Sequence, residues 1–377
     1  MAAQAAGAPH RKHRERPVDL GLGGWLLTLG QALWITCILL GEAVKGLLPR
    51  NRQGGASLYE HLAYSGVRSY QGRLSPARIQ NLLPSTATTC RRFARRHGIR
   101  HSSIKLDDGT VAHQLGPSDA THRVVFFHGG GYMAPALSTH IDFAFGFHPP
   151  RKHVAVYVLQ YSLVTETANQ YPLQLQQAVS LLAHLIHAEG VAPSAMTLVG
   201  DSAGGHLLLG LALHLRHPNP RVPPLSFKGR FAGAAVVSPW LNLHADPEDM
   251  AVCERQDVIE RRAVKRWAAN WLCGAPSDCW NDPLTAPADW WADVPIDGVF
   301  LAYGEDELLR DGCAALAEVL KTAHRSVAAY GVQGELHVQM IMNRFLRLNK
   351  PCASEDIYAR WMQDRLAAKP AQRDART

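Results

Sequence analysis

The sequence predicts an α/β fold, in which a mostly parallel central sheet is flanked by helices and covered at one edge by a helical lid. Strand-like and helix-like apolar runs alternate from Val124 to Ala367, as they do in strand–helix–strand units around a parallel sheet. The 377 residues are enough for one large domain with additional segments. Hydrophobic residues make up 47% of the chain and charged residues 19%, which is typical of a globular protein and excludes a disordered one.

The N-terminal part is predicted to be a separate unit. Residues 1–19 form a basic, polar tail that we expect to be disordered. Residues 20–40 are almost entirely apolar, and as a helix they would reach about 30 Å, the thickness of a bilayer core. We therefore expect a membrane anchor; an amphipathic or buried helix of the lid is the alternative. A cleaved signal peptide is not expected, because its apolar run has only ~7–15 residues.

Basic residues flank this apolar run on both sides. The early cluster slightly outweighs the later one, which favours a cytoplasmic N-terminus and a lumenal catalytic domain. We expect a single pass through the endoplasmic reticulum membrane. The early cluster is Arg11, Lys12, Arg14 and Arg16, and the later one is Lys45, Arg50 and Arg52.

The rest of the chain is predicted to divide into a lid and a core. Residues 55–100 are the N-terminal lid segment, and residues 101–367 are the core, with a lid insertion at about 241–290. Residues 368–377 are expected to be a disordered tail. Tryptophans gather in the insertion, where they either line an apolar pocket or pack the lid's own small core. They are Trp267, Trp271, Trp280, Trp290 and Trp291.

A Gly-Asp-Ser-Ala-Gly-Gly stretch joins a predicted buried strand at 196–199 to a predicted buried helix at 206–213. A serine at such a tight strand-to-helix turn is a nucleophile elbow. Glycines beside it allow the strained dihedrals that hold the serine oxygen clear of the chain. We expect Ser202 to be a catalytic nucleophile. The supporting positions of the turn are Gly200, Asp201, Gly204 and Gly205.

A second glycine motif, His128-Gly129-Gly130-Gly131, follows a strand-like run at 123–127. Acyl transfer places negative charge on the carbonyl oxygen, and preorganised N–H donors must meet that charge. Consecutive glycines let backbone N–H groups approach without obstruction. We expect the oxyanion hole to be formed by the N–H groups of Gly129, Gly130 and Ala203, with His128 and Gly131 as motif support.

A serine nucleophile needs a base, and the base needs an orienting acid. His337 follows the last predicted strand, at 326–330, and therefore falls at the same sheet edge as Ser202. Its place after that strand selects it as the general base from the 19 histidines of the chain. Glu305, Asp306 and Glu307 follow the preceding strand, and only one of them should face the imidazole.

These motifs resemble the hormone-sensitive-lipase-like branch of the α/β-hydrolase superfamily over roughly residues 95 to 365. Members share the two glycine motifs and a late Gly-x-x-His, here Gly334 to His337. The long apolar N-terminus and the Trp-rich insertion are similar to fungal steryl acetyl hydrolases and arylacetamide deacetylase-like esterases. Further matching stretches are Tyr161-Ser162-Leu163-Val164-Thr165-Glu166 with Pro172, in which Thr165 replaces the usual proline, and Ser238-Pro239-Trp240.

The resemblance implies an α/β-hydrolase fold and favours one acid over the other. The family's acid is an aspartate in an Asp-x-Leu-x-Asp pattern. Glu307 occupies its place in Glu307-Leu308-Leu309-Arg310-Asp311. Asp306 is the family's residue type but needs one extra residue before Asp311. We therefore favour Glu307 over Asp306, since either carboxylate can orient a histidine.

The predicted function is that of a serine carboxylic-ester hydrolase that needs no cofactor. The resemblance implies esters of apolar alcohols, such as acetylated sterols or secondary metabolites. The apolar N-terminal segment makes membrane lipid a second expected partner. One alternative is a hydrolase-fold enzyme that catalyses a non-hydrolytic cyclisation or condensation. Another is a non-catalytic receptor; the gibberellin receptor resembles this family but has lost the catalytic histidine, whereas His337 is present here.

The formal net charge is +7, and one cluster of positive charges has two interpretations. This cluster consists of Arg91, Arg92, Arg95 and Arg96, which are either a solvated helix face or a contact for anionic lipid. Nucleic-acid binding is not expected, because these clusters are short and no recognised module surrounds them.

No metal site is expected. Cys273 and Cys279 are close enough in sequence to bridge, or they remain free thiols. The sequence does not indicate an oligomeric state.

Overall fold

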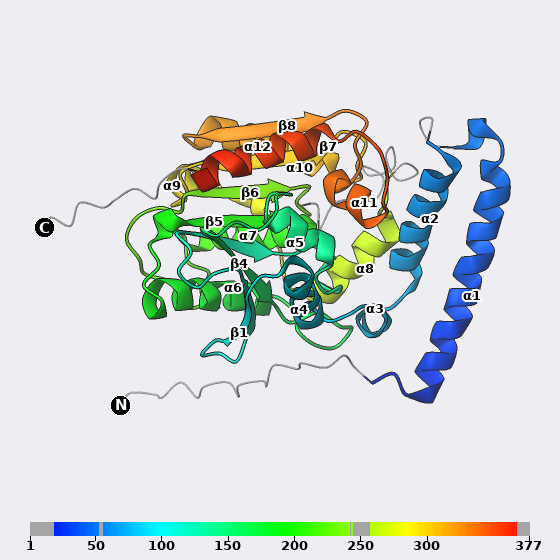
Figure 1. Ribbon diagram of the computed structural model, residues 1–377, viewed down its shortest axis with the longest axis horizontal. Coiled ribbons are helices and arrows are strands. Elements are labelled where there is room, and N and C mark those ends of the chain that lie inside the picture. The colour runs from blue at the N-terminus through cyan, green and yellow to red at the C-terminus, as the bar shows by residue number, and fades with distance from the viewer. Residues whose placement is uncertain (1–18, 53–55, 242, 244–256, 368–377) are drawn as a thin grey trace, which may run out of the picture.

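The computed structural model describes residues 19–52, 56–241, 243 and 257–367. The predicted tails lie outside these residues, apart from Asp19, and so do residues 242 and 244–256 of the predicted insertion. The described chain confirms the α/β class, because an eight-stranded sheet is flanked by helices on both faces (Figure 1).

The strands are arranged in the order β1-β2-β4-β3-β5-β6-β7-β8. β2 runs antiparallel to both β1 and β4, and every other neighbouring pair is parallel. The carboxyl ends of β3, β5, β6, β7 and β8 therefore meet at one edge, which we call the carboxyl edge. The strand bounds are β1 His101–Lys105, β2 Val111–Leu115, β3 His122–Phe127, β4 Val154–Gln160, β5 Met196–Asp201, β6 Gly233–Val237, β7 Val299–Gly304 and β8 Val327–Val332.

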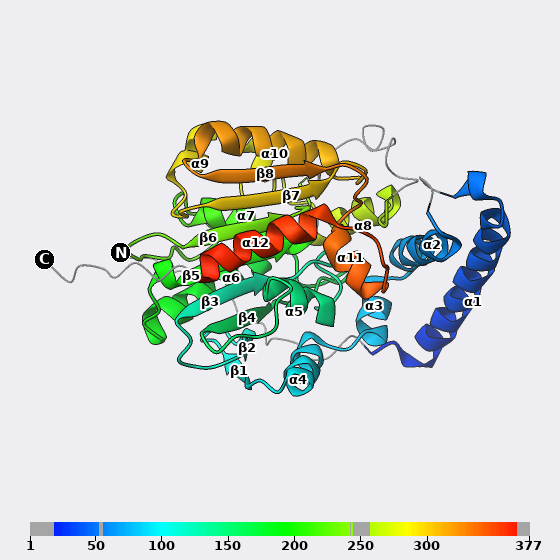
Figure 2. The same cartoon turned by 45° about the horizontal axis from the view of Figure 1, so that its top comes forward.

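Two layers of helices cover the sheet. α4, α5 and α12 lie on one face, and α6, α7 and α10 lie on the other (Figures 1 and 2). The helix bounds are α1 Gly21–Gly46, α2 Leu58–Arg73, α3 Pro76–Leu82, α4 Thr86–His97, α5 Ser138–Ala144, α6 Leu173–Ala183, α7 Ser202–His214, α8 Arg261–Leu272, α9 Ala288–Asp293, α10 Arg310–Ala323, α11 Gln339–Phe345 and α12 Ala353–Ala367.

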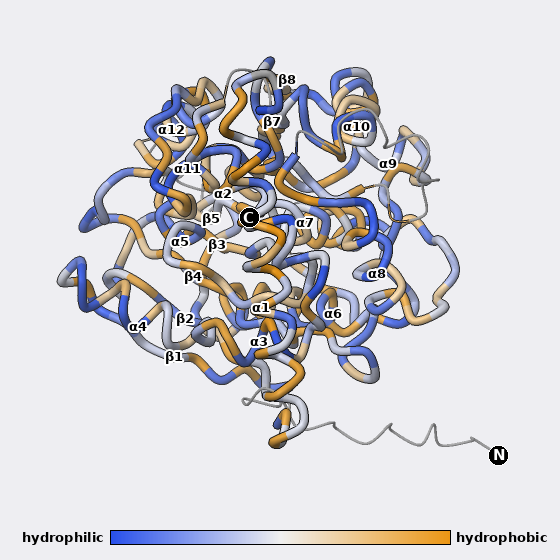
Figure 3. The backbone as a smooth tube through the Cα atoms, turned by 90° about the vertical axis from the view of Figure 1, so that its right-hand side faces the viewer, coloured by the Kyte–Doolittle hydropathy of each residue, from blue (hydrophilic) through white to orange (hydrophobic). Residues whose placement is uncertain are grey.

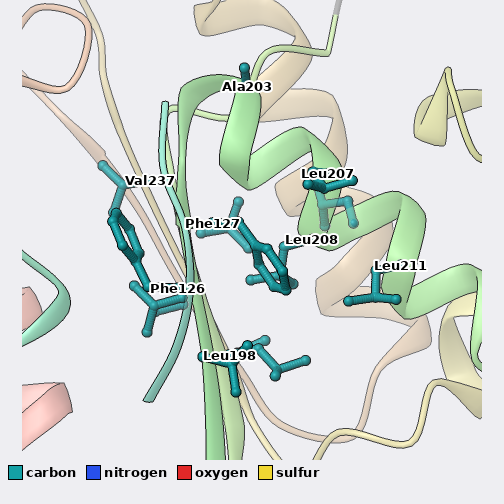
Figure 4. Packing of buried hydrophobic residues seen from close by; sticks show 14 of the residues in the cluster. Phe126, Phe127, Leu198, Ala203, Leu207, Leu208, Leu211 and Val237 are labelled. Atoms are coloured by element: carbon teal, nitrogen blue, oxygen red, sulfur yellow. The ribbon is translucent and has the colours of Figure 1, made fainter. Parts of the chain in front are cut away.

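Buried apolar side chains fill the space where α7 crosses the central strands (Figure 4). Phe127 of β3 points toward Leu208 of α7, while Phe126 and Val237 lie on the opposite side of the sheet (Figure 4). The strands β3, β5 and β6 are buried almost throughout, as expected for parallel strands covered on both faces. This packing fixes the start of α7, where Ser202 lies.

Helix α1 packs along α2 and directs Gln31 and Glu42 toward the protein. Gln31 donates from Nε2 to the carbonyl oxygen of Arg73 at 3.0 Å and accepts from Arg78 Nη1 at 2.8 Å. Glu42 Oε2 lies 3.2 Å from His61 Nε2. We call this pair of helices the α1–α2 hairpin. These contacts are the reverse of those of a soluble helix, which directs its polar side to water.

The outward face of α1 is apolar and uncovered. Leu33 is 69% exposed and Trp34 is 63% exposed. Figure 3 looks onto this side of the molecule, where the hydrophobic colouring extends along α1. Among the described residues, α1 is the one helix that is long and apolar enough to cross a membrane. Other exposed apolar residues of this face are Leu22, Trp25, Leu26, Leu27, Leu29, Leu40 and Val44.

The described part of the insertion between β6 and β7 holds α8 and α9, and its tryptophans mostly pack the interior. Trp271 and Trp291 are fully buried, and Trp280 and Trp290 are partly covered. Trp267 alone among the five also lines the cavity described below. Cys273 and Cys279 are both free thiols.

The four arginines of α4 lie on its exposed face, opposite Cys90, Phe93 and Ala94, which are buried. This arrangement fits a solvated helix face, and contact with anionic lipid stays a prediction.

Candidate active site

Ser202 lies in a sharp turn between β5 and α7, at a backbone φ of +48°. The glycines around it leave space that no side chain could share. A Cβ on Gly200 would lie 2.5 Å from the carbonyl oxygen of Gly204, and a Cβ on Gly204 would lie 1.9 Å from the carbonyl oxygen of Phe127. The sequence folds into this strained turn because only glycine fits at these flanking positions.

His337 lies between β8 and α11 and faces Ser202. Its Nε2 is 2.9 Å from Ser202 Oγ, although the two residues are far apart in the chain. The histidine is buried. At this distance the ring nitrogen can accept the hydroxyl proton directly.

Glu307, and not Asp306, is brought to the imidazole. The Glu307 carboxylate is fully buried, and its Oε1 lies 3.8 Å from His337 Nδ1. This distance exceeds that of a hydrogen bond, so in this structure Glu307 acts on the ring through its charge. Asp306 is only half-buried, and its backbone N–H donates to the carbonyl oxygen of Glu335 at 3.1 Å.

Ser238 holds the Glu307 carboxylate in place. Its Oγ donates to Glu307 Oε2 at 2.6 Å and accepts from the backbone N–H of Val338 at 3.2 Å. The backbone N–H of Gly304 donates to the same carboxylate oxygen at 3.0 Å. Ser238 thus connects the acid to the chain beside the histidine.

The buried charges raise the proton affinity of the histidine. Burial alone lowers the pKa of His337, but Glu307, Asp257 and Asp201 outweigh burial and raise that pKa above its ordinary value. Burial raises the pKa of Asp201 to about 7 and the pKa of Asp257 to about 6. An imidazole surrounded by anions is suited to accept a proton from a hydroxyl group.

The structure corrects the prediction for Gly129. Its backbone N–H donates to Asp201 Oδ1 at 3.0 Å, so it is already used and cannot meet an oxyanion. Gly130 and Gly131 instead line the cavity beside Ser202. For the backbone N–H groups of Gly130, Gly131 and Ala203, the described residues provide no hydrogen-bond acceptor.

His128 and Gly131 shape the glycine loop. The Tyr161 hydroxyl donates to the His128 carbonyl oxygen at 2.8 Å. Burial lowers the pKa of His128 to about 3, so the ring is neutral near neutral pH. Gly131 has a φ of +58°, and a Cβ there would lie 2.7 Å from Trp267 Cε3 in α8. The loop therefore depends on glycine at this position and on contact with the insertion.

Ser202 and His337 open onto a cavity of about 420 Å³. Its wall is mainly apolar and comes from α2, α3, α8, α11 and the glycine loop; Leu62, Val67, Ile79, Val258 and Phe345 are among its members. Phe345 is 43% exposed, so this ring lies where the cavity reaches the surface. A cavity of this size and polarity suits a small apolar ligand.

The sequence does not reveal the contacts of two residues of this site, Ser238 and Asp257. Ser238 lies in the stretch that resembles the family's, but its bond to the acid depends on the packing of β6 against β7. Asp257 stands in a charged part of the insertion, where no motif distinguishes it from its neighbours. In the described part of the chain, no group of three or more His, Cys, Asp or Glu side chains could hold a metal ion.

Comparison with known proteins agrees with this architecture. The chain is 27% identical over 214 residues to steryl acetyl hydrolase 1 of Saccharomyces cerevisiae, a match that covers 53% of this chain and 48% of the relative. It is 26% identical over 199 residues to an acetyl-hydrolase of Streptomyces hygroscopicus, covering 52% of this chain and 60% of the relative. The matches thus span about half of these relatives' lengths.

A crystal structure of a hormone-sensitive lipase from a metagenome library has the same fold. It superimposes with a TM-score of 0.63 at 19% identity, covering 81% of this chain and 97% of that one. The sequence profile of the alpha/beta hydrolase fold family matches residues 124–341. This match includes both glycine motifs and His337, and it covers more than half of the chain. The chain therefore belongs to the alpha/beta hydrolase fold family.

Proposed function

We propose that this protein is a serine hydrolase of carboxylic esters. The observation that carries the proposal is the 2.9 Å contact between Ser202 Oγ and His337 Nε2 at the wall of an apolar cavity. A hydroxyl group in contact with an imidazole of raised pKa is the arrangement that nucleophilic acyl transfer requires. The names of the two relatives reported above, steryl acetyl hydrolase 1 and acetyl-hydrolase, support the same reaction class.

In the first half of the reaction, Ser202 Oγ attacks the ester carbonyl carbon while His337 Nε2 takes the hydroxyl proton. Glu307 stabilises the imidazolium that forms. The negative charge on the carbonyl oxygen is met by the backbone N–H groups of Gly130, Gly131 and Ala203. When the tetrahedral intermediate collapses, the C–O bond breaks and His337 gives its proton to the leaving alkoxide.

In the second half, water replaces the alcohol. His337 takes a proton from the water, and the resulting hydroxide attacks the acyl carbonyl. Collapse returns the proton to Ser202 Oγ and releases the carboxylic acid. His337 relays the proton at every step of both halves.

The substrate class that we propose is an ester of an apolar alcohol, such as an acetylated sterol or secondary metabolite. The apolar lining of the cavity supports an apolar group on at least one side of the ester. Incubation with acyl esters of varied chain length, together with labelling by a fluorophosphonate probe, tests the proposal. Labelling at Ser202 with hydrolysis of short acyl esters supports it. Labelling without hydrolysis of any ester would point to a non-hydrolytic reaction.

We also propose that α1 attaches the enzyme to a membrane, with the endoplasmic reticulum as the membrane and the N-terminus on its cytoplasmic side. The uncovered apolar face of α1 supports attachment, because lipid would remove these side chains from water. The length of the apolar run supports a single pass. The contacts of Gln31 and Glu42 with the rest of the hairpin support a helix that lies along the membrane instead.

Protease protection of tags at the two ends of the chain, in sealed microsomes, separates these two forms of attachment. A single pass places the two tags on opposite sides of the membrane. A helix that lies along the surface leaves both tags on one side. If the full chain does not sediment with the microsomes and both tags stay in the soluble fraction, this result would contradict membrane attachment in either form.

A further inference from the structure

Asp257 lies where the β6–β7 insertion meets the two loops that carry His337 and Glu307. The side chain is fully buried. Its Oδ1 accepts from the backbone N–H of His337 at 3.0 Å and from that of Val258 at 2.7 Å. Its Oδ2 accepts from the backbone N–H of Leu308 at 2.7 Å, next to Glu307. One carboxylate thus joins the insertion to both loops.

Only an anion with two acceptor oxygens meets all three donors. An asparagine in its place would have one acceptor oxygen and would turn an N–H₂ group toward backbone donors. Hydrogen bonds from backbone N–H groups to a carboxylate are stronger than those to a neutral oxygen. Val258 and Ile259, which follow Asp257, line the cavity. The carboxylate therefore fixes part of the cavity wall together with the two loops.

We propose that Asp257 is a positioning residue that sets the separation of His337 from Glu307 and adds a second negative charge beside the imidazolium. This inference rests on the proposed serine hydrolase function. Asp257 touches neither the ester nor the reacting atoms, since its contacts are with the backbones of the two loops. Its effect on the reaction passes through His337.

The charged groups around Asp257 come from three elements. His337 and Glu307 face it from the loops after β8 and β7. Asp201, at the end of β5, adds a further negative charge beside His337. Arg68 of α2 donates from Nη1 to the Asp257 carbonyl oxygen at 2.6 Å, which leaves the carboxylate to the backbone donors. The nearby Tyr64 is neutral, because burial raises the pKa of its hydroxyl.

The insertion offers a matched control. Asp278 also accepts backbone N–H groups, from Trp280 at 3.0 Å and from Asn281 at 2.8 Å. It also accepts from the Tyr171 hydroxyl at 2.9 Å. None of its contacts reaches the loops of His337 or Glu307. Asp278→Asn thus removes a similar structural carboxylate of the insertion without changing the charge beside the histidine.

The experiment compares Asp257→Asn, Asp278→Asn and the unaltered protein by the pH dependence of kcat/KM for a small soluble ester. For Asp257→Asn we expect kcat to fall about ten- to a hundredfold and the acidic limb to move to lower pH, because the imidazolium loses an anion. For Asp278→Asn we expect the limb to stay in place. An Asp257→Asn limb in the original place, with a kcat no lower than that of Asp278→Asn, would overturn the inference.

Asp257→Glu covers the case in which Asp257→Asn does not fold. It keeps the charge and changes the length, so we expect a lower kcat with the acidic limb near its original pH. A limb displaced to lower pH in this variant would contradict the electrostatic role. Failure of the unaltered protein to hydrolyse any ester would count against the proposed function itself. An active unaltered protein with unchanged Asp257 variants would count against this inference alone.

Discussion

The carboxyl edge of the sheet and the α1–α2 hairpin bury opposite kinds of side chain. At the carboxyl edge, Asp201, Asp257 and Glu307 are buried carboxylates, and each accepts hydrogen bonds at 3.0 Å or less. In the hairpin, Leu33 and Trp34 lie uncovered while Gln31 turns inward. Water is excluded from polar groups in one region and left in contact with apolar groups in the other.

The contrast shows that the two regions are stable in different surroundings. A buried carboxylate is stabilised only where fixed donors replace its water, and at the carboxyl edge the protein itself supplies those donors. Burial stabilises an exposed leucine by roughly 25 cal/mol for each Å² that leaves water. The outer face of α1 is therefore stabilised only in contact with an apolar medium.

The largest expected effect is at Ser202. Ser202→Ala should lower kcat for a soluble ester by about five to six orders of magnitude, because the attacking oxygen is removed. It should also abolish covalent labelling by a fluorophosphonate probe. Ser277→Ala, an exposed serine of the insertion, is the control and should keep full activity. Labelling that persists in Ser202→Ala would show that another residue is the nucleophile.

The next effect separates the two carboxylates that follow β7. Glu307→Gln should lower kcat by about three to four orders of magnitude, because its charge supports the imidazolium. Asp306→Asn should change kcat less than about threefold, since its side chain is partly solvated. Steady-state kinetics of both variants under the same conditions provide the measurement. Equal losses from both would remove Glu307 from its proposed role.

A pH profile tests the buried charges of the carboxyl edge. His337 must be neutral to accept a proton, so kcat/KM should fall as the pH drops through its pKa. Because the pKa of His337 is raised from 6.5, this acidic limb should lie above pH 6.5. In Glu307→Gln, any remaining activity should show the limb at lower pH. An acidic limb below pH 6.5 in the unaltered protein would contradict this electrostatic account.

A smaller effect is expected at the cavity wall, to which α2 of the α1–α2 hairpin contributes side chains. Ala63 of α2 lines the cavity. Ala63→Phe should lower kcat/KM for bulky apolar esters by about tenfold and that for a short acetyl ester by less than about twofold. Ala315→Phe on the exposed face of α10 makes the same change away from the cavity and should alter neither. An equal loss with both esters would indicate general disruption.

The smallest effect on catalysis is expected at the outer face of α1. Leu26→Gln with Leu33→Gln should leave hydrolysis of a soluble ester within about twofold but release the protein from sedimenting membranes, since apolar contact with lipid is lost. Leu82→Gln, an exposed leucine of α3, is the matched control. A truncated chain that begins at Asn51 should be soluble and active. Unchanged sedimentation of the double variant would rule out the outer face as the attachment.

The parts of the site that depend on local chain geometry could be predicted from the sequence. Ser202 stands in a turn whose glycines are needed within a few residues of it, so its role is readable from the motif. His337 follows from chain order, because each strand of a parallel sheet ends at the same edge. The spacing to Asp311 favours Glu307 over Asp306, and the structure places the Glu307 carboxylate 3.8 Å from the imidazole; its role as the acid stays a prediction.

The parts that depend on distant contacts could not be predicted. The N–H of Gly129 bonds to Asp201, a residue of a different strand, and nothing within the glycine motif shows that this donor is used. Asp257 has no motif around it, and its partners lie beyond it in the chain, on two other loops. For α1, the apolar composition was readable, but the inward direction of Gln31 appears only with α2 beside it.

The contact between Gly131 and Trp267 has a consequence for how this chain can change over generations. A side chain at position 131 would enter the space of the indole ring in α8, and the positive φ already disfavours any residue but glycine. A larger residue at position 131 is therefore accepted only after Trp267 has been replaced by a smaller residue. The two positions should vary together among descendants of this sequence. A substitution of Trp267 should come first, and a change in the glycine loop that reshapes the cavity should follow it.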